Sequence, residues 1–180
     1  MTCCLLKTGT RSDRGNYVAE LPGVLMVIFF LFCFPLINLG TMALRYGILL
    51  TAAREGANAA AKSYTFETGT TALPPAIVSA PQAVNTLLGK FTGVTVQSID
   101  VDILAINLST NVVTRYENKL SQAADATQSV YCVETEIVGQ LQPLTNYHAG
   151  FLSNIPGLTG PITIKVAARE FSEAPQGLSQ

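Results

Sequence analysis

An uncharged apolar run from Leu21 to Leu44 constrains this chain more than any other feature of its sequence. As a helix that rises 1.5 Å per residue, the run would be about 36 Å long, which exceeds the roughly 30 Å hydrocarbon core of a bilayer. A cleaved secretory signal has a shorter apolar region, of about 7 to 15 residues. We therefore expect one helix that spans a membrane and ends near Arg45.

The flanks of the run predict its orientation. The leader, residues 1–15, carries three basic side chains and one acidic side chain, and a basic excess of this kind stays on the cytoplasmic side of a membrane. Arg45 and Arg54, beyond the run, act in the opposite direction. The sequence thus predicts a single-pass membrane protein with a cytoplasmic N-terminus and a C-terminal domain on the opposite side of the membrane.

The helix is expected to continue beyond the membrane. Residues 45–63 contain no proline and are rich in alanine, a strong helix former. Small residues recur there at four-residue spacing, which lets helices approach closely; they are Ala53, Gly56, Ala57, Ala60 and Ala61. The alternative is that alanine merely fills a solvated stalk. We expect residues 16–63 to form the membrane helix and a helical stalk, and residues 64–180 to form the exported domain.

The exported domain is expected to belong to the α+β class. Residues 64–80 contain several prolines and threonines, which predict a loop, and Pro81 then favours the start of a short helix. Further along, three segments alternate apolar and polar residues, as antiparallel strands with one wet face do. The alternation slips by one near Ser98, which indicates a bulge or a break. We expect a short helix packed on three or four antiparallel strands.

The exported domain offers few candidates for catalysis or ligand binding. Asp100 with Asp102, and Glu134 with Glu136, could bind calcium or transfer protons. The alternation favours the interpretation that they are solvated strand faces. His148 has no nucleophile at a recognisable spacing. The sequence therefore predicts no enzyme, no cofactor and no metal site.

Cysteine usage and charge exclude further classes. Only Cys132 lies in the exported domain, so neither a disulfide framework nor a zinc site with about four ligands is expected. We interpret Cys132 as a small apolar residue on a strand, with an intermolecular disulfide as the alternative. The formal net charge is -1 and the basic residues are scattered, which argues against binding to nucleic acid.

Glu20 stands at the edge of the apolar run. An acidic side chain costs about 2.5–3.5 kcal/mol at the centre of a bilayer and less at its edge, so such a residue suggests a function that needs a positive partner. The alternative is that Glu20 lies among the lipid headgroups and caps the start of a helix, where the helix dipole favours an acid. Considered alone, capping is the simpler interpretation.

The surroundings of Glu20 resemble an export-processing signal. Gly15 follows the basic leader, Glu20 is the fifth residue after it, and the apolar run begins at once. With the stretch Ala53-Arg54-Glu55-Gly56-Ala57, this pattern resembles the TadE-like minor pseudopilins of the tight-adherence (Tad) pilus system, within the type IV pilin-like superfamily. The close resemblance covers about residues 14–63. The phenylalanine usual after the glutamate is Leu21 here. The family's proline about a turn and a half after the glutamate is absent, and Pro22 and Pro35 lie at other positions.

The resemblance implies a non-enzymatic role in pilus assembly, with the protein in the bacterial inner membrane and its C-terminal domain in the periplasm. A prepilin peptidase would cut between Gly15 and Asn16, and Glu20 would pair with the new amine of a neighbouring subunit. The implied partners are other pilin and pseudopilin subunits, the prepilin peptidase, the inner-membrane assembly platform and membrane lipid. The alternative is an uncleaved, membrane-anchored module that binds a periplasmic ligand. An anchored hydrolase is the third and least favoured hypothesis.

Overall fold

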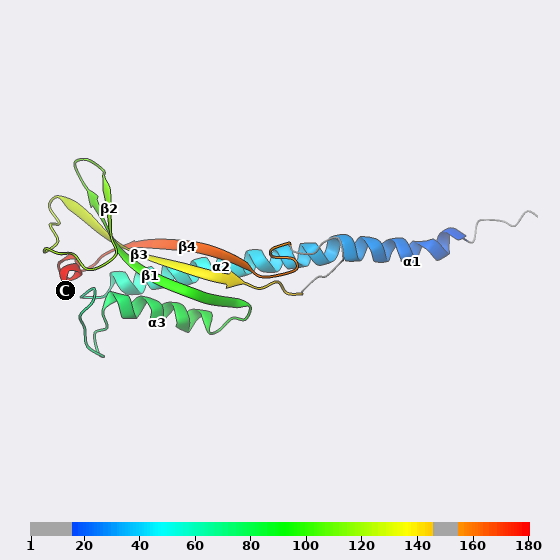
Figure 1. Ribbon diagram of the computed structural model, residues 1–180, viewed down its shortest axis with the longest axis horizontal. Helices are drawn as coiled ribbons and strands as arrows, with labels where there is room; N and C mark the ends of the chain where they lie inside the picture. The colour runs from blue at the N-terminus through cyan, green and yellow to red at the C-terminus, as the bar shows by residue number, and fades with distance from the viewer. Residues whose placement is uncertain (1–15, 146–154) are drawn as a thin grey trace, which may run out of the picture. The chain divides into compact units, whose positions relative to one another are not determined.

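The computed structural model describes residues 16–145 and 155–180, with side chains from Glu20 onward. The chain divides into two compact units, with the boundary between Ile37 and Asn38. The helices are α1 (Asn16–Ile28), the π-helical turn η2 (Phe29–Cys33), α2 (Phe34–Ala61), α3 (Ala76–Leu88) and the 3-10 helix η3 (Pro175–Ser179). The strands are β1 (Val94–Asn107), β2 (Val113–Tyr116), β3 (Ser129–Leu141) and β4 (Ile162–Phe171) (Figure 1). These elements agree with the predicted α+β class.

A long apolar helix begins the described chain. Helix α1 passes through η2 into α2, and the stretch Glu20–Ala61 is the one helix of the described residues that is long and apolar enough to cross a membrane. The expected apolar helix is confirmed as a candidate anchor. The wide turn η2 lies next to Pro35. Proline has no N–H to donate and its ring crowds the carbonyl four residues earlier, which accounts for the local widening.

The strands form one antiparallel sheet in the order β2-β1-β3-β4. β1 pairs with β3 over its whole length, from Val94 to Asn107. The register shifts between Val96 and Ser98, which confirms the bulge that the phase slip predicts. The expectation of three or four antiparallel strands is confirmed, and there are four in the described part of the chain.

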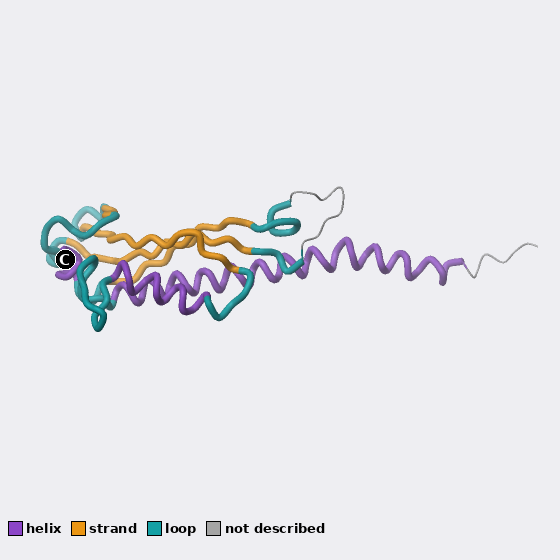
Figure 2. Tube along the Cα trace, turned by 60° about the horizontal axis from the view of Figure 1, so that its bottom comes forward, coloured by secondary structure: helices purple, strands orange, loops and turns teal. Residues whose placement is uncertain are grey.

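Helices α2 and α3 cover one face of the sheet (Figure 2). Leu49 of α2 packs directly on the backbone of β3, because a Cβ added to Gly139 would lie 2.8 Å from Leu49 Cδ2. The buried side chains of this cluster are Met42, Leu49, Ala52, Ala53, Val84, Leu88, Ile137, Leu141 and Val166. A second cluster includes Phe66, from the loop that precedes α3, and Leu178, from η3. The sheet therefore has one face in the core and one face directed outward.

Helix α3 begins earlier than the sequence predicts. Its first residue is Ala76, and Pro81 lies inside it. The N–H of Ala76 donates to the carbonyl of Thr65 at 2.9 Å, and the next N–H donates to the carbonyl of Phe66 at 3.2 Å. These carbonyls satisfy donors that a helix start leaves without intrahelical partners. The predicted start at Pro81 is wrong because the preceding loop caps the helix upstream of this proline.

The small residues of α2 are buried inside the second unit. Ala53, Gly56, Ala57, Ala60 and Ala61 are all buried. A Cβ on Gly56 would lie 2.7 Å from Val84 Cγ2 in α3 and 3.0 Å from Thr135 Cγ2 in β3. The solvated-stalk interpretation is wrong for these residues, because α3 and the sheet cover them. Residues 45–63 therefore form a wall of the folded domain rather than a stalk that precedes it.

The two glycines Gly47 and Gly56 of α2 predict opposite effects of the same substitution. Gly47→Ala should raise the free energy of unfolding by roughly 1 kcal/mol, because nothing lies within 4 Å of its added Cβ and alanine favours helix. Gly56→Ala should lower it by about 1–2 kcal/mol, because overpacking outweighs the same helix gain. Denaturant unfolding of the full chain in detergent, followed by circular dichroism, measures both. A stabilising Gly56→Ala would contradict the close approach of α2, α3 and β3.

Candidate functional site

Glu20 lies one turn inside α1 rather than at its start. The helix begins at Asn16, and no acidic residue lies in its first turn. The favourable effect of the helix dipole on an acid fades within that turn. Capping is therefore a weaker explanation for Glu20 than the sequence alone suggests. Gly15 lies outside the described residues, and Asn16 is described by its backbone alone.

The helix beyond Glu20 presents apolar side chains in every direction. Each large hydrophobic side chain from Leu21 to Phe32 is at least 40% exposed. Exposing such side chains to water costs about 25 cal/mol for each Å² of apolar surface. Lipid or neighbouring apolar helices would remove this cost. The surface of this unit is therefore suited to a bilayer and to contact with similar helices.

The Ala-Arg-Glu-Gly-Ala stretch of α2 divides between the core and the surface. Ala53, Gly56 and Ala57 face α3 and the sheet, whereas Arg54 and Glu55 are exposed. The small residues are needed for the packing of this chain on itself. The two charged side chains between them are the part of the stretch that another protein can reach.

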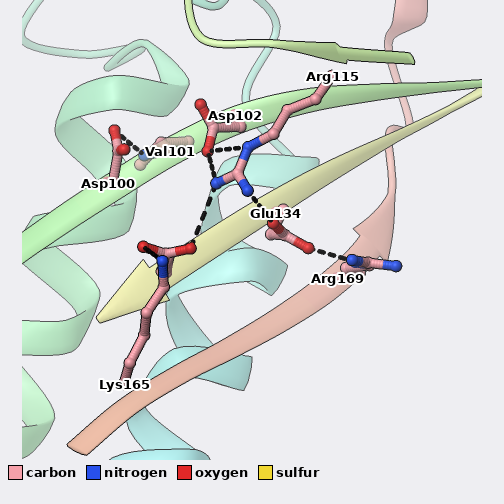
Figure 3. Close-up of polar contacts among 8 residues, drawn as sticks. Asp100, Val101, Asp102, Arg115, Glu134, Lys165 and Arg169 are labelled. Carbon is pink, nitrogen blue, oxygen red and sulfur yellow. Dashed lines mark hydrogen bonds and ion pairs between the residues drawn. The ribbon is translucent and has the colours of Figure 1, made fainter. Parts of the chain in front are cut away.

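Four carboxylates lie on the outward face of the sheet. The register places Asp100 opposite Glu136 and Asp102 opposite Glu134. Asp102 is 0% exposed and Glu134 is 2% exposed, although Asp100 is exposed. The interpretation of these acids as solvated strand faces is therefore wrong for Asp102 and Glu134. They are buried because the guanidinium of Arg115, from β2, lies between them (Figure 3).

Three basic side chains pair with three of these four carboxylates. Arg115 Nε donates to Asp102 Oδ2 at 2.9 Å, and its terminal nitrogens lie 3.4 Å from Glu134 Oε1 and 3.3 Å from Glu136 Oε2. Lys165 Nζ lies 2.6 Å from Glu136 Oε1, and Arg169 pairs with Glu134. Like charges opposite each other destabilise a sheet, so these cations hold the facing acids together. The network joins β2, β1, β3 and β4.

The pKa shifts follow from burial and from these ion pairs. Burial raises the pKa of Asp102, although its hydrogen bond to Arg115 acts in the opposite direction. The same hydrogen bond raises the pKa of Arg115, and the hydrogen bond to Lys165 lowers the pKa of Glu136. Asp102 Oδ1 has no hydrogen-bond partner among the described residues. Arg115 is thus the main group that favours the ionised form of this buried acid, against the effect of burial.

The charged network joins the four strands through ion pairs and is not arranged as a ligand site. The carboxylate oxygens face arginine and lysine nitrogens, which compete with any cation. Within the described ranges, no group of three or more His, Cys, Asp or Glu side chains could hold a metal ion. His148 lies outside these ranges. Cys132 is buried on β3, as the interpretation of it as a small apolar strand residue predicts, and burial raises the pKa of its thiol.

The sequence interpretation missed Arg115. A signal was present, because a polar turn precedes the short alternating segment Val113–Tyr116. Asn107 Oδ1 accepts hydrogen bonds from the N–H groups of Ser109 and Thr110, each at 3.0 Å, and Asn111 has a positive φ of 56°. Turns of this kind reverse a chain between paired strands.

A comparison of the chain with protein-family models, curated proteins and solved structures finds no match.

Proposed function

We propose that this protein is a minor pseudopilin, a non-enzymatic membrane-anchored subunit in the assembly of a pilus of the tight-adherence type. The observation that carries the proposal is the placement of Glu20. It lies one turn after Asn16 at the head of an apolar helix, which continues into the core of an α+β domain. The resemblance of residues 14–63 to TadE-like pseudopilins supports the same function.

In the proposed mechanism, cleavage between Gly15 and Asn16 creates a free amine at the start of α1. Glu20 then pairs with the amine of a neighbouring subunit. At about 4 Å and an effective dielectric near 20, such a pair contributes about 4 kcal/mol before desolvation. This exceeds the cost of holding an acid at the lipid edge, which is below the roughly 2.5–3.5 kcal/mol of the bilayer centre. Pairing would therefore favour the addition of a subunit to the growing assembly over its retention in lipid.

The domain that follows α1 would lie in the periplasm and face neighbouring subunits. Arg54 and Glu55 are exposed on α2 and are available for contact. The partners proposed are other pilin-like subunits, the prepilin peptidase and the assembly platform of the inner membrane. The competing function is an uncleaved anchored module that captures a periplasmic ligand, and the mature N-terminus distinguishes the two.

Cleavage is tested by the intact mass of the protein extracted from membranes of cells that possess the peptidase. We expect a chain that begins at Asn16. Gly15→Leu should leave the full-length mass, because the residue at the cleavage point must be small. The matched control is Gly23→Leu, since Gly23 lies inside α1 with nothing within 4 Å of its added Cβ. A full-length mass for the unaltered chain would reject the pseudopilin and favour the anchored module.

A further inference from the structure

After β3, residues 142–145 follow the last turns of the apolar run and form the first described arm of the connection to β4. Asn38 is fully buried in α2, where its Nδ2 donates to the Thr145 carbonyl at 2.8 Å and its Oδ1 accepts from the Thr145 N–H at 3.1 Å. Arg45, about two turns further along, donates to the carbonyl of Gln142. The arm from Gln142 to Thr145 therefore descends along the helix by about 10 Å, at 1.5 Å per residue.

The second arm of the connection, residues 155–161, reaches the same part of α2. A Cβ added to Gly157 would lie 3.4 Å from Met42 Cε, and Met42 is buried. Both arms lie at the end of the sheet where β3 ends and β4 begins (Figure 2). The two arms are thus packed beside residues 38–45, and most of these residues belong to the apolar run.

The two described arms carry no charged side chain, and each exposes a large apolar side chain. No Asp, Glu, Lys or Arg occurs between Glu136 and Lys165. Leu144 is 55% exposed on the first arm, and Ile155 is 39% exposed on the second. Leu44 of α2 is also exposed. Exposed apolar side chains beside an apolar helix lower their cost of exposure to water when they contact lipid.

Charged and amphipathic side chains begin at Arg45. Tyr46 follows it and is exposed on α2. At the end of α3, Phe91 lines an apolar groove together with Leu44, and the exposed Lys90 precedes it. Tyrosine, arginine and lysine gather at the headgroup level of membrane proteins, where an apolar stem meets a polar end. These side chains indicate that the surface of the bilayer lies near Arg45. The two arms then lie on the lipid side of that surface.

We propose that the two described arms between β3 and β4, residues 142–145 and 155–161, form a second membrane contact, in which Leu144 and Ile155 enter the boundary between the headgroups and the acyl chains of a phospholipid bilayer. The proposal rests on the membrane-anchored part of the proposed function. Segments that lie in this boundary bind through buried apolar side chains. The bonds between Asn38 and Thr145 satisfy the polar atoms that would otherwise be costly near lipid. The domain is thereby held to the bilayer at two points.

A single introduced tryptophan tests the contact, because the chain contains none. Leu144→Trp is compared with Leu108→Trp, since both leucines are 55% exposed. Leu108 directly follows the Asn107 end of β1, whereas Leu144 lies near the Val94 end of that strand. The full chain is reconstituted in vesicles of phosphatidylethanolamine and phosphatidylglycerol that carry brominated acyl chains. We expect the emission of Leu144→Trp to shift to shorter wavelength and to be quenched several-fold more than that of Leu108→Trp. Aqueous iodide should quench mainly Leu108→Trp.

Insertion of the anchor is measured separately with Val27→Trp, which lies in α1 and is 63% exposed. Strong quenching of Val27→Trp by brominated lipid, with Leu144→Trp resembling Leu108→Trp, would overturn the second contact and leave the anchor in place. Weak quenching of Val27→Trp would overturn both. The readout does not depend on cleavage or on pilus assembly, so it also distinguishes this proposal from the pseudopilin function.

Discussion

Glu20→Gln is expected to abolish the association of this protein with other pilin-like subunits while leaving its synthesis, membrane insertion and cleavage unchanged. The amide keeps the size of the side chain but removes a charge–charge interaction of about 4 kcal/mol. It also leaves the amine of the neighbouring subunit unpaired beside lipid, which is costly. A helix cap would lose at most about 1 kcal/mol from the same change. Co-purification with the other pilus components, measured beside the cleaved fraction, separates the two roles.

Two further variants sharpen this experiment. Glu20→Asp should show intermediate association, because the charge remains on a shorter arm. Glu55→Gln is the matched control, since it makes the same chemical change at an exposed acid of α2. We expect it to be cleaved normally and to associate more strongly than Glu20→Gln. Normal association of Glu20→Gln would refute the pairing role, although cleavage after Gly15 would stand.

Arg115→Gln is expected to lower the free energy of unfolding at neutral pH by about 2–3 kcal/mol. Removing one partner of a buried ion pair costs about 3–5 kcal/mol, and the value is smaller here because the Arg115 side chain is 43% exposed. The variant leaves Asp102 buried without its cation. Lys165→Gln is the control, because its side chain is 63% exposed and should contribute at most about 1 kcal/mol. Chemical unfolding of the full chain in detergent gives both values.

The pH dependence of this loss identifies its cause. The folded-state pKa of Asp102 is already raised, so its ionisation reduces stability as the pH rises through that value. Without Arg115 this pKa rises further, and the deficit of Arg115→Gln should shrink as the pH falls and Asp102 becomes protonated. Glu136 acts with the opposite sign, because its pKa is lowered in the folded state. Its ionisation stabilises the fold at pH values above the ordinary glutamate pKa, and this stabilisation is lost as the pH falls. A deficit that stays constant down to pH 4 would contradict the burial of an ionised Asp102.

A double-mutant cycle provides an independent test of the same pair. Asp102→Asn combined with Arg115→Gln replaces both charges by amides and should recover part of the lost stability, because no isolated charge remains buried. Additive losses of the two single variants would show that the pair is not coupled.

Local patterns predict the parts of this fold that depend on neighbours in the chain. The apolar run identifies the helix, and the phase slip near Ser98 identifies the bulge in β1. Both follow from periodicity within one element. The expected helix start at Pro81 was wrong because the carbonyls that cap α3 come from a loop about ten residues earlier.

The burial of Asp102 and Glu134 could not be predicted from alternation alone. Alternation assigns both acids to the outward face, which is where they lie. Whether that face is wet depends on Arg115, which reaches them only after β2 pairs with β1. The small residues of α2 posed the same difficulty, because their spacing predicts close packing but cannot say which element packs there.

Helix α2 sets a strict limit on insertions and deletions. Asn38 must meet Thr145, and Gly56 must meet α3 and β3, on one rigid helix. Each inserted or deleted residue between Asn38 and Gly56 would rotate one contact relative to the other by about 100°, since a turn contains 3.6 residues. Side chains on the exposed face of this stretch are free to vary, but its length is not. Descendants of this chain should therefore diverge here by substitution and change length in their loops.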